Sequence, residues 1–257
     1  MVDVTDAFPS SVRATAHIYV DRLDDGCALE GDDAHHLQRV RRVRAGEVLT
    51  AADGHGRWRT YDVADVGPRG ITLRATSEVM YEPRLAPALT VACALTKGDR
   101  PELVVQKLTE LGVDTIVLVG AARSVVRWDE SRAAAATTRL RTIAREAGAQ
   151  CRRARLPVLD GPVAPAALVG RDGLVVADLE GVPAAELALP PSGEWVVAIG
   201  PEGGFDDAEL EQFAGAPRLA IGPFVLRAET AAIAAASALA GLRRPGPSLS
   251  PRDRGEW

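Results

Sequence analysis

Two glycine-containing loops hold the residues best suited to binding a small molecule. Gly200-Pro-Glu-Gly-Gly204 follows the apolar run Trp195-Val-Val-Ala-Ile199, and Gly222-Pro-Phe-Val-Leu-Arg-Ala-Glu-Thr230 follows Leu219-Ala-Ile221. Each apolar run predicts a β-strand, and the carboxyl ends of parallel strands meet at the edge of the sheet where ligands bind. Because glycine has no side chain, a ligand can approach the backbone of such loops closely. The two loops therefore predict one small-molecule site.

The first loop departs from the known phosphate-binding motifs. It is neither Gly-x-Gly-x-x-Gly nor a P-loop, which also requires a Lys followed by Ser or Thr. An ordinary strand-to-helix turn is the simpler interpretation, but three glycines together with Pro201 and Glu202 in five residues favour a binding loop. Asp206, with Glu209 three residues later, has the pattern of a capping box and predicts that a helix begins there.

The residues that surround these loops predict strands alternating with helices. Additional strands are expected at 89–95, 115–119 and 174–179, and helices at 99–112, 130–149 and 231–242. Asp99 is placed to cap the first of these helices and Gly112 to end it. Such alternation implies an α/β domain with a parallel sheet covered on both faces. From this pattern alone, a Rossmann-type fold would follow.

The first part of the chain has a different pattern, which predicts a small β-barrel. Short strands are expected at 17–20, 48–51, 58–66 and 71–76, with one helix from Asp32 or Asp33 to about Arg42. The proline-containing segment 82–87 is the best linker. We therefore expect domains at 1–84 and 88–242, and the proline-rich residues 243–257 are expected to form a disordered tail.

Net charge and composition limit the classes of partner. The 257 residues carry a net charge of −5, with 47% hydrophobic and 25% charged residues, as in a soluble globular protein. This charge argues against non-specific coating of nucleic acid, although a local basic patch can still bind RNA. The arginines 39, 41, 42 and 44 form one candidate patch, and a second segment, 139–155, contains six arginines, Arg153 among them. A solvated charged face is the alternative interpretation of either segment.

The sequence points away from membranes and metals. No apolar run approaches the roughly 20 residues that span a bilayer, and the first residues lack the apolar core of a signal peptide. Three cysteines without a Cys-x-x-Cys pair predict reduced, buried thiols and a cytoplasmic protein. On a helix the adjacent His35 and His36 would point about 100° apart, unlike the i, i+4 pairs that bind zinc. We expect no metal site and no membrane association.

The two loops, read together, resemble the signature of a known family. Gly-Pro-Glu-Gly-Gly at 200–204, followed by Gly-Pro-x-Val-Leu-Arg-x-Glu-Thr-Ala at 222–231, is similar to that of the RsmE-type 16S rRNA uracil-N3 methyltransferases of the SPOUT superfamily. The resemblance extends to 97–112, 144–157 and 35–44, and so covers roughly residues 15 to 242 in four ordered motifs. The chain has Phe224 where the family usually has Arg, and Ala149 where it often has Glu, although Arg153 is retained.

The resemblance implies a fold, a cofactor and partners. The fold would be a SPOUT-type parallel sheet with a C-terminal trefoil knot, preceded by a PUA-like RNA-binding β-barrel; spacing and composition do not indicate a knot, and true knots are rare. The methyl donor would be S-adenosylmethionine, the substrate 16S rRNA of the small ribosomal subunit, and the active form a homodimer. The patch 39–44 and Arg153 would then contact RNA. The expected cofactor-binding residues are Leu179, Gly200, Pro201, Glu202, Gly203, Gly204, Ile221, Gly222, Val225, Leu226 and Thr230.

The same resemblance directs the catalytic assignment. A neutral uracil imide is a poor nucleophile, so the site should favour loss of the N3 proton through a base or through cationic donors near O2 or O4. Arg227 is the first candidate for this electrostatic role, and Glu229 could accept the proton or orient Arg227. An ion pair between these two that only fixes the loop is the alternative. Thr230 is expected chiefly to cap the last helix, and Glu202 to organise its own loop.

Two other functions are compatible with the motifs. A SPOUT ribose 2′-O-methyltransferase is one, but the upstream motif around Gln106 and Lys107 argues against it. A non-catalytic RNA-binding assembly factor that retains the fold is the other, and the intact Gly200–Gly204 loop argues against it. Binding of S-adenosylmethionine separates the last alternative from an enzyme.

Overall fold

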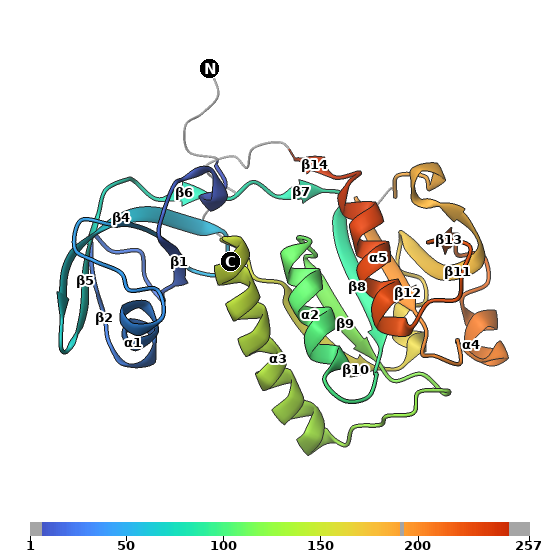
Figure 1. The fold of residues 1–257 in the computed structure, drawn as a ribbon. Helices are drawn as coiled ribbons and strands as arrows, with labels where there is room; N and C mark the ends of the chain where they lie inside the picture. The colour runs from blue at the N-terminus through green and yellow to red at the C-terminus, as the bar shows by residue number, and fades with distance from the viewer. Residues whose placement is uncertain (1–6, 191–192, 247–257) are drawn as a thin grey trace. The chain divides into compact units, whose positions relative to one another are not determined.

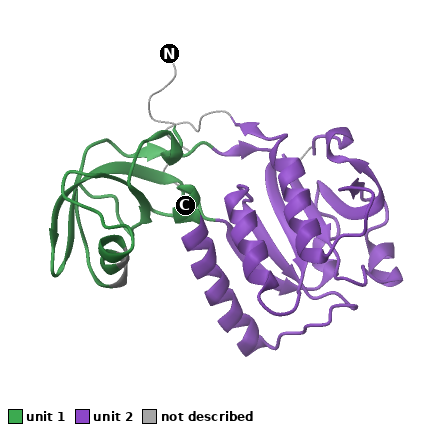
Figure 2. Ribbon diagram, viewed as in Figure 1, with its two compact units in different colours: residues 1–83, 148–156, 247–257 green, residues 84–147, 157–246 purple. Residues whose placement is uncertain are grey.

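The structure, a computed structural model, describes residues 7–190 and 193–246 (Figure 1). It divides into two compact units, coloured separately in Figure 2. Among the described residues, the first unit comprises 7–83 and 148–156, and the second comprises 84–147 and 157–246. The short segment 148–156, expected from sequence in the second domain, is thus part of the first unit.

The first unit is built on a six-stranded sheet of mixed direction. Its strand order is β1-β3-β4-β5-β2, with β6 paired to β4; β1 and β3 are parallel, and the other pairs are antiparallel. The elements are β1 (Ala16–Tyr19), β2 (Gly26–Leu29), α1 (Gly31–Arg39), β3 (Val48–Ala52), β4 (Arg57–Gly67), β5 (Gly70–Ala75) and β6 (Met80–Tyr81). The core of this unit is formed by side chains that alternate along these strands, among them Leu49, Tyr61 and Leu73.

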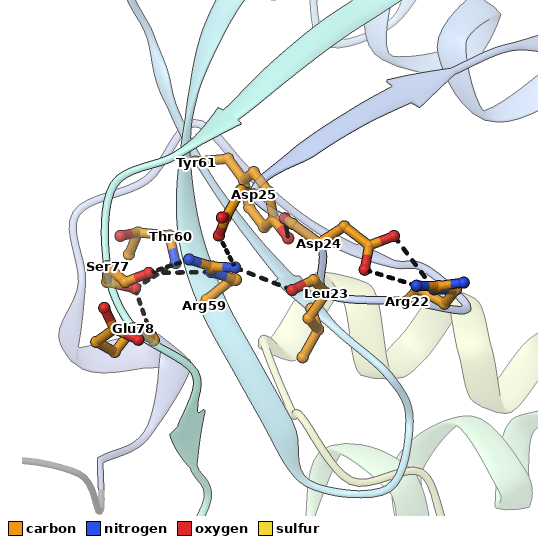
Figure 3. A network of polar contacts seen from close by, with 9 residues as sticks. All are labelled: Arg22, Leu23, Asp24, Asp25, Arg59, Thr60, Tyr61, Ser77 and Glu78. Atoms are coloured by element: carbon orange, nitrogen blue, oxygen red, sulfur yellow. Dashed lines mark hydrogen bonds and ion pairs between the residues drawn. The ribbon is translucent and has the colours of Figure 1, made fainter.

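A buried arginine ties the loops of the first unit to its sheet. The Arg59 guanidinium donates to the carbonyl oxygens of Ser77, at 2.6 and 3.0 Å, and of Leu23, at 2.9 Å (Figure 3). It also pairs with the exposed Asp25 at 3.1 Å and lies over the ring of Tyr61. Because these partners satisfy its donors, the charge can be buried without the full desolvation cost.

The segment 148–156 is fixed in the first unit by backbone contacts. The Arg153 carbonyl accepts hydrogen bonds from the Tyr19 hydroxyl, at 2.6 Å, and from His17 Nε2, at 3.0 Å. The Ala154 amide donates to the buried carboxylate of Glu82. A Cβ at Gly148 would overlap the Tyr19 hydroxyl, so a larger residue there would force the Tyr19 side chain to shift. Sequence patterns do not reveal this arrangement because the segment continues a helix that begins in the second unit.

The second unit contains an all-parallel six-stranded sheet, and every hydrogen-bonded pair in it is parallel. Its order is β10-β9-β8-β12-β11-β13. The strands are β8 (Ala88–Ala94), β9 (Thr115–Val119), β10 (Val158–Val163), β11 (Leu174–Pro183), β12 (Glu194–Ile199) and β13 (Arg218–Ala220). The helices are α2 (Arg100–Glu110), α3 (Glu130–Cys151), α4 (Asp207–Gln212) and α5 (Ala228–Ala240), of which α3 extends into the first unit.

The central strands of this sheet are buried along nearly their whole length, as expected for parallel strands covered on both faces. Helix α5 packs against α2 and against β8 and β12 (Figure 1). Its core positions Ala232, Ala235 and Ala236 are fully buried, and their small side chains let the helix approach the sheet closely. The helix predicted at 231–242 therefore packs into the core of the second unit.

Residues 243–246 correct the predicted tail. The Arg243 side chain is buried, donates to the carbonyls of Pro87, Gly112 and Leu85, and pairs with Asp114. Strand β14 (Arg244–Pro245) pairs with β7 (Leu85–Ala86). The proline content of this region suggested disorder, but a cation that satisfies several backbone carbonyls anchors it. The rest of the predicted tail, 247–257, lies outside the described residues.

Three further findings concern membranes, cysteines and metals. Within residues 7–190 and 193–246, no helix is both long and apolar enough to cross a membrane. None of the three cysteines forms a disulfide; Cys93 is buried, which raises the pKa of its thiol to about 12, whereas Cys27 and Cys151 are partly exposed. In the same described ranges, no three His, Cys, Asp or Glu side chains gather as metal ligands would.

Candidate functional site

A pocket of about 320 Å³ opens at the carboxyl edge of β11, β12 and β13. The two glycine-containing loops and residues 176–179, in the middle of β11, form its walls. Ten of the eleven residues predicted to bind a cofactor line it: Leu179, Gly200, Pro201, Glu202, Gly203, Gly204, Ile221, Gly222, Val225 and Leu226. The two strand exits thus border one pocket, as their positions in the sequence suggest.

The first loop is held between β12 and a well-capped helix. Asp206 accepts from the Glu209 amide at 2.8 Å, and the Glu209 carboxylate accepts from the Asp206 amide at 2.9 Å, which is the predicted capping box. Gly204 has a φ of +69°, a conformation that favours glycine, and its amide donates to the Pro201 carbonyl at 2.8 Å. The backbone of the loop is therefore fixed before any ligand binds.

The backbone conformation of Gly203 and Gly222 does not require glycine. A Cβ at Gly203 would lie 3.5 Å from Arg123 Cβ, an ordinary contact, and a Cβ at Gly222 would meet nothing within 4 Å. Neither residue has a positive φ. Since the protein itself would tolerate a Cβ at both positions, a ligand that approaches the backbone explains why both are glycine.

The second loop ends at α5, which begins three residues earlier than the sequence suggests. Arg227 is the N-cap residue, its carbonyl accepting from the Ala231 amide at 2.8 Å, so Thr230 is the third residue of the helix. Thr230 is exposed and does not line the pocket. Its expected capping role is wrong because Ala228 and Glu229 already have helical conformation. Among the predicted cofactor residues, it alone stands outside the pocket lining.

The two residues predicted to be catalytic lie in different environments. Arg227 is exposed where α5 begins. Glu229 is 8% exposed, and its carboxylate pairs with Arg100 at 3.5 Å rather than with Arg227. The Arg227–Glu229 ion pair considered above is therefore not the arrangement observed among the described residues.

Arg100, the first residue of α2, links both loops. Its Nη1 donates to Glu202 Oε1 at 2.9 Å, and its Nε lies 3.5 Å from Glu229 Oε1. The other Glu229 oxygen is buried without a hydrogen-bond partner among the described side chains and backbone. Glu202, expected to bond within its own loop, instead reaches across to α2. One guanidinium thus joins α2, the first loop and the start of α5.

Arg123 is a second residue that sequence patterns do not reveal. It lies in the loop after β9, lines the pocket, and donates from Nη1 to the carbonyls of Gly203 and Phe205, both at 3.1 Å. Arg100 and Arg123 both come from segments that follow other strands of the sheet. Only the strand order β9-β8-β12 brings them to the first loop, and spacing along the chain does not reveal that order.

The two arginine segments differ in exposure. Arg39, Arg41, Arg42 and Arg44, at the end of α1 and directly after it, are all exposed. In the other segment, Arg139 pairs with Glu102 at 2.6 Å, and the last three arginines lie partly buried in the first unit.

The end of the second segment has a structural role. Arg152 donates to the carbonyls of Val12 and Ala14 at 3.0 and 2.6 Å, and Arg155 donates to the carbonyl of His55. Arg153 is half-buried, and its carbonyl anchors the segment. The arginines of segment 139–155 therefore lie in two environments, and a contact of Arg153 with RNA stays a prediction.

Two family profiles match the chain. A profile described as an RNA methyltransferase domain matches residues 83–240, and one described as an RNA methyltransferase PUA domain matches residues 29–76. Both agree with the α/β fold and the PUA-like first domain expected above. The trefoil knot stays a prediction.

Individual relatives align over most of the chain. The ribosomal RNA small subunit methyltransferase E of Mycobacterium bovis is 36% identical over 235 residues, which cover 86% of this chain and 89% of the relative. The protein of the same name from Bacillus subtilis is 29% identical over 226 residues, covering 82% and 88%.

Solved structures of methyltransferases also align with most of the chain. A methyltransferase of Legionella pneumophila, solved with bound S-adenosylmethionine, superposes with a TM-score of 0.78 at 31% identity, covering 90% of this chain and 98% of that one. The ribosomal RNA small subunit methyltransferase E of Neisseria gonorrhoeae, solved with the same cofactor, has a TM-score of 0.76 at 26% identity, covering 88% and 97%.

Proposed function

The chain belongs to the RNA methyltransferase family that includes ribosomal RNA small subunit methyltransferase E, and from this premise we propose that it methylates N3 of a uridine in 16S rRNA. S-adenosylmethionine is the methyl donor. The observation that carries the proposal is the pocket whose two walls contain Gly203 and Gly222, since neither glycine is required by the protein's own sterics. A close ligand accounts for both.

The residues of this pocket fit the cofactor. Adenine has apolar faces and a polar edge, so backbone groups of Ile221, Val225 and Leu226 can satisfy its edge while apolar side chains cover its faces. Leu179 and the Gly200–Gly204 loop enclose the other side. When bound, S-adenosylmethionine supplies an electrophilic methyl group on sulfur. Holding the acceptor in line with such a group contributes on the order of 7–11 kcal/mol to catalysis.

Arg227 and Glu229 take different roles in this proposal. Arg227 is exposed at the N-cap of α5, where its guanidinium can stabilise the negative charge that develops on uracil as N3 loses its proton. Glu229 is buried and already paired with Arg100, which favours an orienting role over that of proton acceptor. We therefore assign the electrostatic role to Arg227 and a supporting role to Glu229.

The first unit is proposed to bind RNA through the exposed arginines 39, 41, 42 and 44. Replacing Arg39, Arg41 and Arg42 with Ala should weaken binding to small ribosomal subunits. The salt slope should fall by about 0.9 for each phosphate of duplex-like RNA that the variant no longer neutralises. The matched control is Arg152→Lys, which changes an arginine bonded to backbone carbonyls. If the triple variant has the same salt slope as the parent, these arginines form only a solvated charged face and do not bind RNA phosphates.

We also propose a homodimer acting in the cytoplasm. Phe224 and Val225, which line the pocket, are 76% and 81% exposed, the two highest values among the exposed large apolar side chains of the described residues. A second copy of the chain would cover them. Sedimentation equilibrium of the parent and of Phe224→Ser tests this: a monomeric parent would contradict the dimer.

A two-part experiment tests the function. Calorimetric titration with S-adenosylmethionine should show binding, and incubation with unmethylated small subunits should then place one methyl group on a uracil base. A protein that gives no heat and no methylation would be a binding module only. A methyl group found on ribose rather than on the base would favour the 2′-O-methyltransferase alternative.

A further inference from the structure

A second hollow, of about 560 Å³, opens at the same edge of the parallel sheet, beyond the ends of β8, β9 and β10. Its lining includes Arg127 and Trp128 from the loop after β9, Pro162 and Pro165 around the end of β10, and Glu209 and Gln212 from α4. The catalytic proposal above uses none of its aromatic or cationic groups. Its volume lies within the roughly 300–1,000 Å³ typical of small-molecule sites.

This hollow shares a wall with the cofactor pocket. The Ala122 amide, in that wall, donates to Glu209 Oε1 at 2.7 Å. The next residue, Arg123, lines the cofactor pocket and bonds the carbonyls of Gly203 and Phe205. A molecule in the second hollow would therefore lie one loop away from the proposed methyl donor.

The charges in the hollow favour an anion. Both carboxylate oxygens of Glu209 accept backbone N–H bonds, from Ala122 and from Asp206, so this acid is satisfied within the protein. Arg127 is exposed, and its Nη2 contacts the Ala122 carbonyl only at the long distance of 3.5 Å. A phosphate oxygen would give this guanidinium a shorter, charge-assisted hydrogen bond.

The remaining groups suit a flat ring. Trp128 is half-buried, packs against the core of the second unit, and also lines the hollow, together with Pro162 and Pro165. Exposed Gln212 adds an amide that can donate to and accept from a base edge. Unstacked RNA bases bind by stacking on aromatic side chains, with Arg on the phosphate.

We propose that this hollow is a nucleotide subsite that holds an unstacked nucleotide flanking the methylated base, with Trp128 on the base and Arg127 on its phosphate. The inference rests on the proposed function and adds a second anchor for the substrate RNA. The proposal predicts that the enzyme binds its substrate RNA on both sides of the wall formed by residues 121–123.

The test compares Arg127→Ala, Trp128→Leu and Trp128→Phe by steady-state methylation of unmethylated small subunits over a range of salt concentrations. Arg127→Ala should raise KM about tenfold and lower the salt slope of log KM by about 0.7. Trp128→Leu should raise KM about tenfold without changing the slope, and Trp128→Phe should recover most of the loss. For all three, kcat and the Kd for S-adenosylmethionine should stay within about twofold of the parent.

Arg132→Ala is the matched control, because Arg132 is also exposed, lies five residues further on, and does not line the hollow. An equal change in slope for Arg132→Ala would show general charge attraction and overturn the subsite. So would unchanged KM values in the Arg127 and Trp128 variants, or a Kd for the cofactor that rises with KM. Each result presupposes that the parent methylates subunits; a parent without activity refutes the proposed function instead.

Discussion

Replacing Arg100 with Met removes the guanidinium that joins the two loops while keeping an unbranched apolar stem. The pair with Glu202 is partly exposed, at 34% and 37%, so its loss should cost only about 0.2–1 kcal/mol. The Glu229 side chain is 10% exposed, and it would lose the cation facing it. Removing one partner of a fully buried pair costs roughly 3–5 kcal/mol. Because Arg100 itself is 34% exposed, we expect a smaller total, about 2 kcal/mol.

A second substitution should partly reverse this effect. Glu229→Gln removes the charge that Arg100→Met leaves unpaired, so the double variant should be more stable than Arg100→Met alone. Urea unfolding of the four proteins gives a coupling energy, expected at about 1–2 kcal/mol. Calorimetry should show weaker binding of S-adenosylmethionine by Arg100→Met, since the first loop loses its link to α2. A coupling below about 0.5 kcal/mol would refute the role given to this cluster.

Three further changes probe the pocket and the first unit. Gly203→Val should abolish cofactor binding in calorimetry, because its branched side chain fills space needed by the ligand. The unfolding midpoint should stay nearly unchanged, because a Cβ at this position meets only Arg123 at ordinary distance. Binding within a few-fold of the parent would contradict the loop assignment. Arg227→Ala should lower the single-turnover methylation rate about 10²–10³-fold with little change in cofactor Kd, and Arg227→Lys should rescue it partly; equal losses of rate and binding would make Arg227 structural. Burial lowers the pKa of His17 to about 4, below its unfolded value of 6.5. The contribution of the neutral imidazole to the free energy of unfolding is therefore complete above about pH 6.5 and falls by roughly 3 kcal/mol as the pH drops to 4. Urea unfolding of His17→Gln should lack this part of the pH dependence, and an identical profile for both proteins would show that His17 does not cause it.

Local patterns predict most elements of the fold. Apolar runs such as 115–119 and 195–199 match β9 and most of β12, since a parallel strand buried on both faces leaves a continuous hydrophobic signature. Strands β2 and β10 escape prediction because they contain few buried residues. Helix α1 begins at Gly31, one or two residues before the predicted cap, within the usual error of helix boundaries.

The binding loops are predictable from sequence, whereas the side chains that brace them are not. Gly203 and Gly222 lie shortly after apolar runs, so their sequence context already suggests close backbone approach. Arg100 and Arg123 act through contacts with residues about 80 or more positions away, which depend on strand order. The expectations for Glu229 and Thr230 differ from the structure for a related reason: burial and the start of α5 are tertiary properties.

Mass-spectrometric mapping of modified nucleotides in 16S rRNA, from cells with and without the gene, is the decisive test of uridine N3 methylation by this protein. We predict that a single uridine loses a base methyl group in the deletion strain. Re-expression of the parent protein should restore the N3 methyl group, and re-expression of Gly203→Val should not. A deletion strain with an unchanged set of 16S rRNA modifications, or one that lacks a ribose methyl group instead, would contradict the proposed function.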